Sequence, residues 1–155
     1  MKERTTSSRF TESVEPVGPP LIGALLRRPL DVVRRRMLER LHERGFVDFE
    51  AAHLNALQYP GPHGMRPSEL AAQLGMSKQA LNYLLGELER LGYIERQQDR
   101  DDRRSKRIVL TERGHSVVPV IREAVAEVET TWARELGRER FAQLRELLID
   151  LNDLI

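Results

Sequence analysis

A stripe of five leucines in the middle of the chain marks the clearest secondary-structure element of the sequence. The stripe consists of Leu81, Leu84, Leu85, Leu88 and Leu91. This spacing is typical of a helix that buries one face. Ser77 can cap the start of this helix with its hydroxyl, and Gly92 can stop it. The pattern predicts an amphipathic helix between these two residues.

A shorter helix is predicted directly before it. Pro67 suits a first helical position, Glu69 suits the first turn, and Gly75 ends the helix after about Leu74. After Gly92, the segments 93–96 and 107–111 have the β-branched and aromatic content of strands. The ten residues between them are almost all charged or polar, which predicts a hairpin with a charged tip. Two short helices, a tight turn between them and a hairpin together predict a winged helix-turn-helix.

Apolar residues at helical spacing continue on both sides of this unit. They predict a long helix over 21–44, a short helix from about Asp48 to Leu57, and two helices over 112–155 that divide near Gly137. The long helix carries Leu25, Leu26, Leu30, Val33, Met37, Leu38 and Leu41, and the last two carry Val117, Val118, Ile121, Val125, Val128, Trp132, Phe141, Leu144, Leu147, Leu148, Leu151, Leu154 and Ile155. The fold class is therefore mainly α with a small β-hairpin wing (α+β).

The expected organisation has four parts: a flexible arm over 1–20, a first dimerisation helix over 21–47, the winged unit over 48–111, and C-terminal dimerisation helices over 112–155. The last part carries more apolar surface than one helix pair can bury on a small core, which favours a second copy of the chain as partner. The alternative is that these helices pack only on their own chain.

The polar face of the leucine-striped helix is a candidate DNA-reading surface. With the leucines turned inward, the opposite face presents Lys78, Gln79, Asn82 and Tyr83. These side chains carry the donors and acceptors that read base edges in the major groove. For any one of them, an ordinary solvated helix face is an equally good interpretation. The arginines of the hairpin tip suit a narrow minor groove, although a solvated tip would be the alternative interpretation of the loop alone.

These residues resemble the MarR family of bacterial transcription regulators, most clearly in MSKQALNYLLGELERLGYIER followed by DRRSKRIVLTERG. In that family an Asp-x-Arg precedes the Leu-Thr that closes the second strand. The resemblance implies that Arg104 enters the minor groove and that Asp102 braces the wing. Arg66 departs from the threonine or serine of many relatives, so that helix start should be looser or Arg66 should serve a phosphate. The predicted DNA-binding residues are Arg66, Ser68, Ser77, Lys78, Gln79, Asn82, Tyr83, Asp102, Arg103 and Arg104.

Charge supports DNA binding through its distribution, because the formal net charge is only +1. From Arg90 to Arg107 there are seven basic and four acidic residues, whereas acidic residues predominate from Glu112 onward. A two-fold dimer predicts half-sites about 10 bp apart in a pseudo-palindrome, and repression is the default expectation. The alternatives are an architectural DNA-binding protein or a protein-association module, neither with an effector.

The resemblance also implies a small phenolic or otherwise aromatic effector, bound where the winged unit joins the dimerisation helices. The side chains with a polar group on an apolar body near such a junction are His42, His53, Tyr59 and Trp132. Ordinary packing is the alternative for each, and it is the one we favour.

Several other functions are excluded or disfavoured by the composition. The chain has no cysteine, which excludes sensing of peroxides through a thiol. Its four histidines are scattered without metal-ligand spacing, and no catalytic or cofactor-binding motif is present, so we expect no metal, no cofactor and no enzyme activity. No stretch is long and apolar enough to span a membrane, and a soluble cytoplasmic protein is expected.

Overall fold

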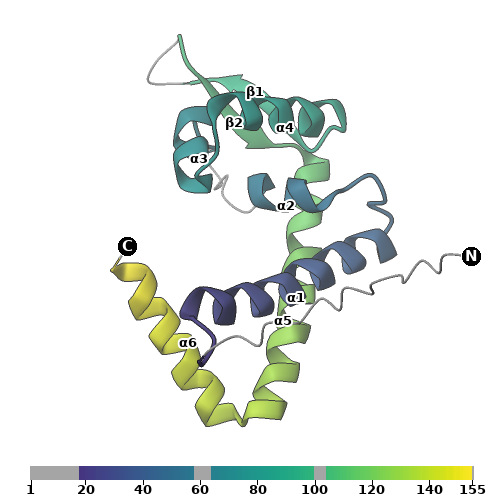
Figure 1. Cartoon of the computed structure of the whole chain (residues 1–155). Helices are drawn as coiled ribbons and strands as arrows, with labels where there is room; N and C mark the ends of the chain where they lie inside the picture. Colours follow the sequence, from purple (N-terminus) through teal and green to yellow (C-terminus); the bar gives the residue numbers. More distant parts are fainter. Residues whose placement is uncertain (1–17, 58–63, 100–103, 155) are drawn as a thin grey trace, which may run out of the picture.

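The computed structural model describes residues 18–57, 64–99 and 104–154, which form six helices and one two-stranded hairpin (Figure 1). The elements are α1 (Ile22–Glu43), α2 (Ala51–Leu57), α3 (Pro67–Leu74), α4 (Lys78–Arg90), β1 (Ile94–Gln98), β2 (Lys106–Leu110), α5 (Glu112–Leu136) and α6 (Arg138–Asp153). This order confirms the predicted mainly helical architecture with a hairpin wing. Tyr59, Asp102, Arg103, Ile155 and nearly all of the predicted N-terminal arm lie outside the described residues.

Helices α2, α3 and α4 and the hairpin form the winged unit. Gly75 adopts a left-handed conformation with φ of 61°, which lets the chain turn sharply between α3 and α4. The hairpin is antiparallel, with Ile94 opposite Leu110 and Gln98 opposite Lys106. Met65 pairs with Ile108 in an isolated bridge, so the segment before α3 extends the hairpin by one pair. These ties hold the two helices and the wing in one compact unit.

Strand β1 begins one residue later and ends two residues later than predicted, and β2 lies one residue earlier than predicted. Tyr93 is excluded from β1 because its N–H donates to the Leu88 carbonyl at 2.9 Å, which closes the C-terminus of α4. Thr111 is excluded from β2 because its hydroxyl caps α5, accepting from the Gly114 N–H at 3.1 Å. Helix α2 begins at Ala51, later than predicted, because the N–H of Phe49 donates into a turn that precedes it.

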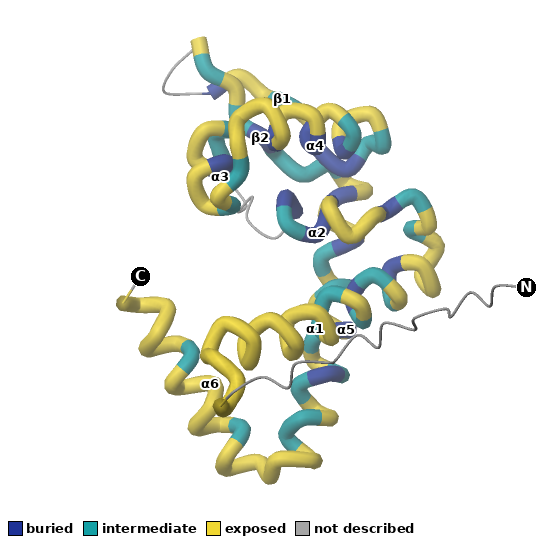
Figure 2. The backbone as a smooth tube through the Cα atoms, in the orientation of Figure 1, coloured by how far each residue is buried: buried dark blue, intermediate teal, exposed yellow. Residues whose placement is uncertain are grey.

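The buried core lies inside the winged unit and at its contacts with the C-terminal half of α1 and the first half of α5 (Figure 2). The leucine stripe of α4 points into it, and Leu85 and Leu88 are fully buried. On α5, Val120 and Ala124 are buried beside the predicted Val117, although the sequence pattern did not single them out. The stripe on α4 therefore orients the helix and leaves its polar face outside.

The other end of the molecule has little core. Helix α6 has no buried residue, and the first half of α1 is exposed along its whole length (Figure 2). Large apolar side chains at this end stand in solvent, including Leu21, Ile22, Leu25, Leu147 and Leu154. Among the described residues, no helix is both long and apolar enough to cross a membrane.

A ladder of ion pairs connects α1 to α5. Arg36 and Arg40 both donate to the Glu127 carboxylate, and Arg44 pairs with Glu123 at 2.8 Å. The hydrogen bond from Arg36 holds the pKa of Glu127 below its usual value, and the same bond raises the pKa of Arg36. Because these groups stand at or near the surface, each pair stabilises the fold only slightly. The ladder mainly fixes how the two helices align.

Candidate nucleic-acid interface

The N-terminal half of α4 presents a polar surface to solvent. Ser77 caps the helix by accepting from the Ala80 N–H at 3.1 Å, as its position in the sequence predicts. Lys78, Gln79 and Asn82 are exposed on the following turns, and Tyr83 is 71% exposed. An exposed aromatic ring on a helix so well anchored by its other face is available to a partner.

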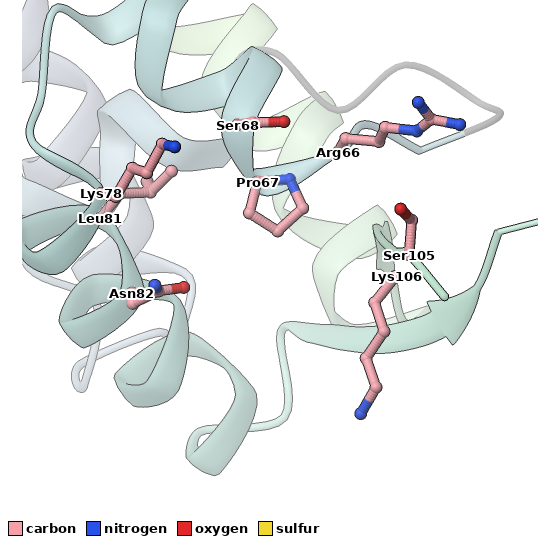
Figure 3. Close-up of a pocket in the computed structure, with 8 residues that line it drawn as sticks. All are labelled: Arg66, Pro67, Ser68, Lys78, Leu81, Asn82, Ser105 and Lys106. Carbon is pink, nitrogen blue, oxygen red and sulfur yellow. The ribbon is translucent and has the colours of Figure 1, made fainter. Parts of the chain in front are cut away.

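A groove of about 280 Å³ lies between this helix, the start of α3 and the base of the wing (Figure 3). Its lining residues are Arg66, Pro67, Ser68, Lys78, Leu81, Asn82, Ser105 and Lys106. None of these eight side chains is acidic. Two ammonium groups, a guanidinium, two hydroxyls and an amide thus surround the groove, and all of them can donate to phosphate oxygens. Four predicted DNA-binding residues, Arg66, Ser68, Lys78 and Asn82, are brought together here.

The base of the wing is organised by Asp99, a residue that the sequence analysis did not single out. Its carboxylate is fully buried and accepts from Arg66 Nε at 2.7 Å, and Arg107 lies 3.5 Å from the same oxygen. The Asp99 N–H donates to the Ser105 carbonyl at 3.0 Å, and Arg107 also donates to the Gly64 carbonyl at 2.9 Å. A buried carboxylate needs such partners to remain charged. Asp99 therefore ties the start of α3 to both strands of the wing.

Arg66 fills the N-cap position of α3 without giving its side chain to the cap. An arginine side chain carries only donors and cannot accept from the helix N–H groups. The helix compensates in the other direction, because Glu69 accepts from the Arg66 N–H at 3.1 Å. This is the half of a capping box that an arginine permits. The Arg66 guanidinium instead pairs with Asp99 and lines the groove.

On the wing, the predicted minor-groove residue Arg104 is exposed just before β2, followed by the exposed Lys106. Their position beside the groove places positive charge on the same face as the start of α4. Asp102 and Arg103 lie outside the described residues, so the predicted brace between Asp102 and Arg104 stays a prediction.

The two candidate effector histidines lie on α1 and α2, where the long helix leads into the winged unit. His42 is exposed, and its Nε2 lies 2.8 Å from the Phe49 carbonyl. His53 is buried against the Phe49 ring, and its Nδ1 accepts from the Glu50 N–H at 3.0 Å. Burial lowers the pKa of His53, against the opposing effect of Glu50. The neutral ring is therefore favoured.

Trp132 lies at the other end of the molecule. It lines a shallow cavity of about 200 Å³ between α1 and α5, together with Val32, Arg36, Glu127, Val128 and Thr131. Neither His42 nor His53 lines this cavity. Tyr59 lies outside the described residues, and the assignment of all four residues to an effector site stays a prediction.

Residues 50–105 match the model of the MarR family, a segment that contains α3, α4, β1 and all the residues that line the groove except Lys106. A 53-residue segment is 43% identical to the transcriptional repressor MprA of Escherichia coli strain K12. That segment is 34% of this chain and spans only 30% of the length of MprA.

Solved structures match over most of the chain. The transcriptional regulator Tm0710 from Thermotoga maritima is 27% identical with a TM-score of 0.58, covering 85% of this chain and 92% of the other. The repressor CouR, whose structure contains a 23-mer DNA duplex, is 26% identical with a TM-score of 0.66 and the same two coverages. The likeness therefore extends beyond the winged unit to α1 and the C-terminal helices.

Proposed function

We propose that this chain, whose residues 50–105 match the MarR family, is a dimeric, sequence-specific DNA-binding regulator of transcription rather than an enzyme. The observation that carries the proposal is the groove beside α4, which is lined by donors from three elements and by no carboxylate. The exposed start of α4 would enter the major groove, with Lys78, Gln79 and Asn82 meeting base edges. Such a protein works in the cytoplasm, where its DNA is.

On this proposal the wing meets the neighbouring minor groove. Arg104 would enter it, and Lys106 and Arg66 would neutralise phosphates on either side of α4. Ser68, Ser77 and Tyr83 would add contacts to the backbone of the duplex. The role of Asp99 is to hold this array at a fixed distance from α4.

A second copy of the chain is the proposed occupant of the apolar surface at the other end. The first half of α1 and the whole of α6 expose leucines and isoleucines that no described segment of the same chain covers. A two-fold pair would bury them and place two α4 helices about one turn of DNA apart. The expected operator is then a pseudo-palindrome with half-sites about 10 bp from centre to centre.

Repression by occupying promoter DNA is the proposed activity. A small aromatic effector would release the DNA by favouring a dimer whose two winged units have a different spacing. The size of that response is limited by how much better the effector binds one spacing than the other.

The test is to select the purified full chain against a random duplex pool at near-physiological salt and to sequence what is retained. We expect an enriched palindrome, and Asn82→Ala or Gln79→Ala should relax it at one or two positions, each contact being worth ~1–3 kcal/mol. Gln73→Ala is the matched control, because Gln73 is an exposed glutamine on α3 that does not line the groove.

Retention without enrichment, lost steeply as salt rises, would reduce the interaction to phosphate contacts and favour an architectural protein. No retention at any salt would favour a protein-association module. Either result would overturn the proposed function.

A further inference from the structure

Tyr93 lies where the winged unit meets the long helices. Its side chain is fully buried, and its ring packs edge-on against Phe49 with centroids 5.2 Å apart. Phe46 lies on another side at 6.4 Å. Both phenylalanines come from the connection between α1 and α2, whereas Tyr93 itself follows α4. Two segments of the chain thus meet at one ring.

Asp48 and Arg113 complete this convergence. The Asp48 carboxylate accepts from the Tyr93 hydroxyl at 2.6 Å and from Arg113 at 2.9 and 3.0 Å, one bond to each oxygen. The Arg113 guanidinium lies 4.3 Å above the centre of the Tyr93 ring, a favourable cation–π position. Burial opposes ionisation of Asp48, but the bonds from Tyr93 and Arg113 outweigh it and leave its pKa below the usual value.

The first turn of α5 is pressed against the same residue. A Cβ on Gly114 would lie 2.0 Å from the Tyr93 carbonyl oxygen, so only glycine permits this approach. The Thr111 N–H donates to that same carbonyl at 3.1 Å, and Arg113 donates to the Leu91 carbonyl at the end of α4. The start of α5 is therefore fixed to the winged unit by side chain and backbone together.

Beyond this point α5 leaves the winged unit and runs beside α1 (Figure 1). Pro119 has no N–H, so α5 lacks one helical hydrogen bond just after its first two turns. The next polar ties of α5 are to α1, through Arg44 with Glu123 and the Glu127 pairs, and they fix α5 against α1 and not against α4. The polar contacts that hold α5 directly to the end of α4 are those around Tyr93 and Arg113.

We propose that Asp48, Tyr93 and Arg113 form a locking joint that sets the angle between the winged unit and α5. They are positioning residues, since none of them lines the groove. In the dimer the joint would determine how far apart the two α4 helices stand, and this second step rests on the proposed function. The Arg113 guanidinium suits the role because its two terminal nitrogens hold two segments at once: Nη2 donates to the Asp48 carboxylate and Nη1 donates to the Leu91 carbonyl.

The joint can be tested without DNA by measuring distances between spin labels. The chain has no cysteine, so Gln73→Cys on α3 and Glu135→Cys at the end of α5 give two unique label positions. Both residues are exposed. Labelled protein is diluted with excess unlabelled protein, so that only pairs within one chain contribute. We expect one narrow distance distribution, which broadens or shifts in Asp48→Asn and Arg113→Gln.

Two further variants separate the joint from general destabilisation. Tyr93→Phe keeps the ring and removes only the hydroxyl, and Arg113→Lys keeps the charge without the planar guanidinium that reaches Asp48 and Leu91 together. Arg44→Gln is the matched control, because it breaks a comparably exposed α1–α5 pair outside the joint. All variants are compared at a temperature where their circular dichroism matches that of the wild type. An unchanged distribution in folded joint variants would overturn the proposal.

The consequence for DNA is tested with the enriched palindrome and with versions whose half-sites are one base pair closer or farther apart. The wild type should discriminate against both shifted spacings, because a base pair changes separation and rotational phase together. In Asp48→Asn and Arg113→Gln this discrimination should fall by roughly fivefold or more, while binding to a single half-site is unchanged.

The distance measurement and the DNA-binding measurement can fail independently of each other. If the wild type selects no palindrome, the proposed function fails while the label distances still decide the joint. If the label distances change in the joint variants but the discrimination between half-site spacings does not, the joint sets the angle within one chain without setting the separation of the two α4 helices. The second step of the proposal is then overturned.

Discussion

The winged unit and the terminal helices differ in how completely they are folded within one chain. Every helix of the winged unit contributes buried residues, from Leu54 and Leu57 on α2 to Leu88 on α4. Helix α6, with sixteen residues, contributes none. The winged unit therefore buries its own apolar side chains, whereas the terminal helices leave theirs exposed to solvent.

This difference indicates that the winged unit has to be rigid within one chain and that the terminal helices need a partner. Base edges are read by a few side chains, so α4 has to be held firmly by its own chain. The terminal helices have no such task in a single copy, and their exposed leucines are explained by association. The two ends should therefore respond differently to the same kind of substitution.

The largest expected effect comes from Leu147→Asp on α6. A charge buried without a partner at the interface should raise the dimer dissociation constant at least ~100-fold. The winged unit should nevertheless stay folded, because its core does not include α6. Sedimentation gives the mass and circular dichroism the helix content. An intact dimer would remove α6 from the interface, and an unfolded monomer would abolish the contrast between the two ends.

The next effect is on the core of the winged unit. Leu85→Ala should lower the free energy of unfolding by ~2–5 kcal/mol, because Leu85 is fully buried and its removal leaves a cavity. In the Leu147→Asp background, the matched Leu151→Ala should cost less than ~0.5 kcal/mol, since Leu151 is exposed in the single chain. Chemical denaturation measures both. Equal losses would show that α6 is packed within one copy after all.

A smaller effect is expected for Arg104→Ala on the wing. Removing one cation should weaken binding to the enriched palindrome by roughly tenfold, with a greater loss at sites flanked by A·T pairs, where the minor groove is narrow. Arg122→Ala removes the same charge from the exposed surface of α5 and should leave affinity unchanged. Equal loss on all flanking sequences would assign Arg104 to a phosphate instead.

The smallest effect is a pH dependence that should be confined to the winged unit. Burial lowers the pKa of His53 in the folded protein, so below about pH 6.5 the unfolded chain takes up a proton that the folded one does not. Stability should then fall as the pH drops from 6.5 toward the folded pKa, by at most ~1.4 kcal/mol per pH unit. His53→Asn should reduce this loss between pH 7 and 5.5, and His115→Asn, at an exposed site, should not. Identical slopes in all three proteins would contradict the burial argument.

The sequence predicted the helices, the hairpin and the polar face of α4 because each depends on local periodicity, capping and turn residues. Ser77, Gly75 and the leucine stripe carry that information within a few positions. The start of β1 and the end of β2 were off by one because Tyr93 and Thr111 close neighbouring helices, which depends on tertiary contacts.

The roles of Asp99, Asp48 and Arg113 could not be predicted in this way. Asp99 stands among other charged residues at the hairpin tip, and its partner Arg66 is 33 residues away. Asp48 and Arg113 are separated by 65 residues. A single sequence contains no local signal for such pairs, since each residue alone has the composition of an ordinary solvated surface.

The length of α5 makes the position of the winged unit sensitive to the direction in which this helix leaves it. Twenty-five helical residues extend about 37 Å. With the far end held by a second copy, a change of about 5° in the direction of α5 would displace the winged unit at its start by about 3 Å, close to the ~3.4 Å of one base-pair step. A small change in the angle between α5 and the winged unit would therefore displace the winged unit by about one base-pair step along the DNA.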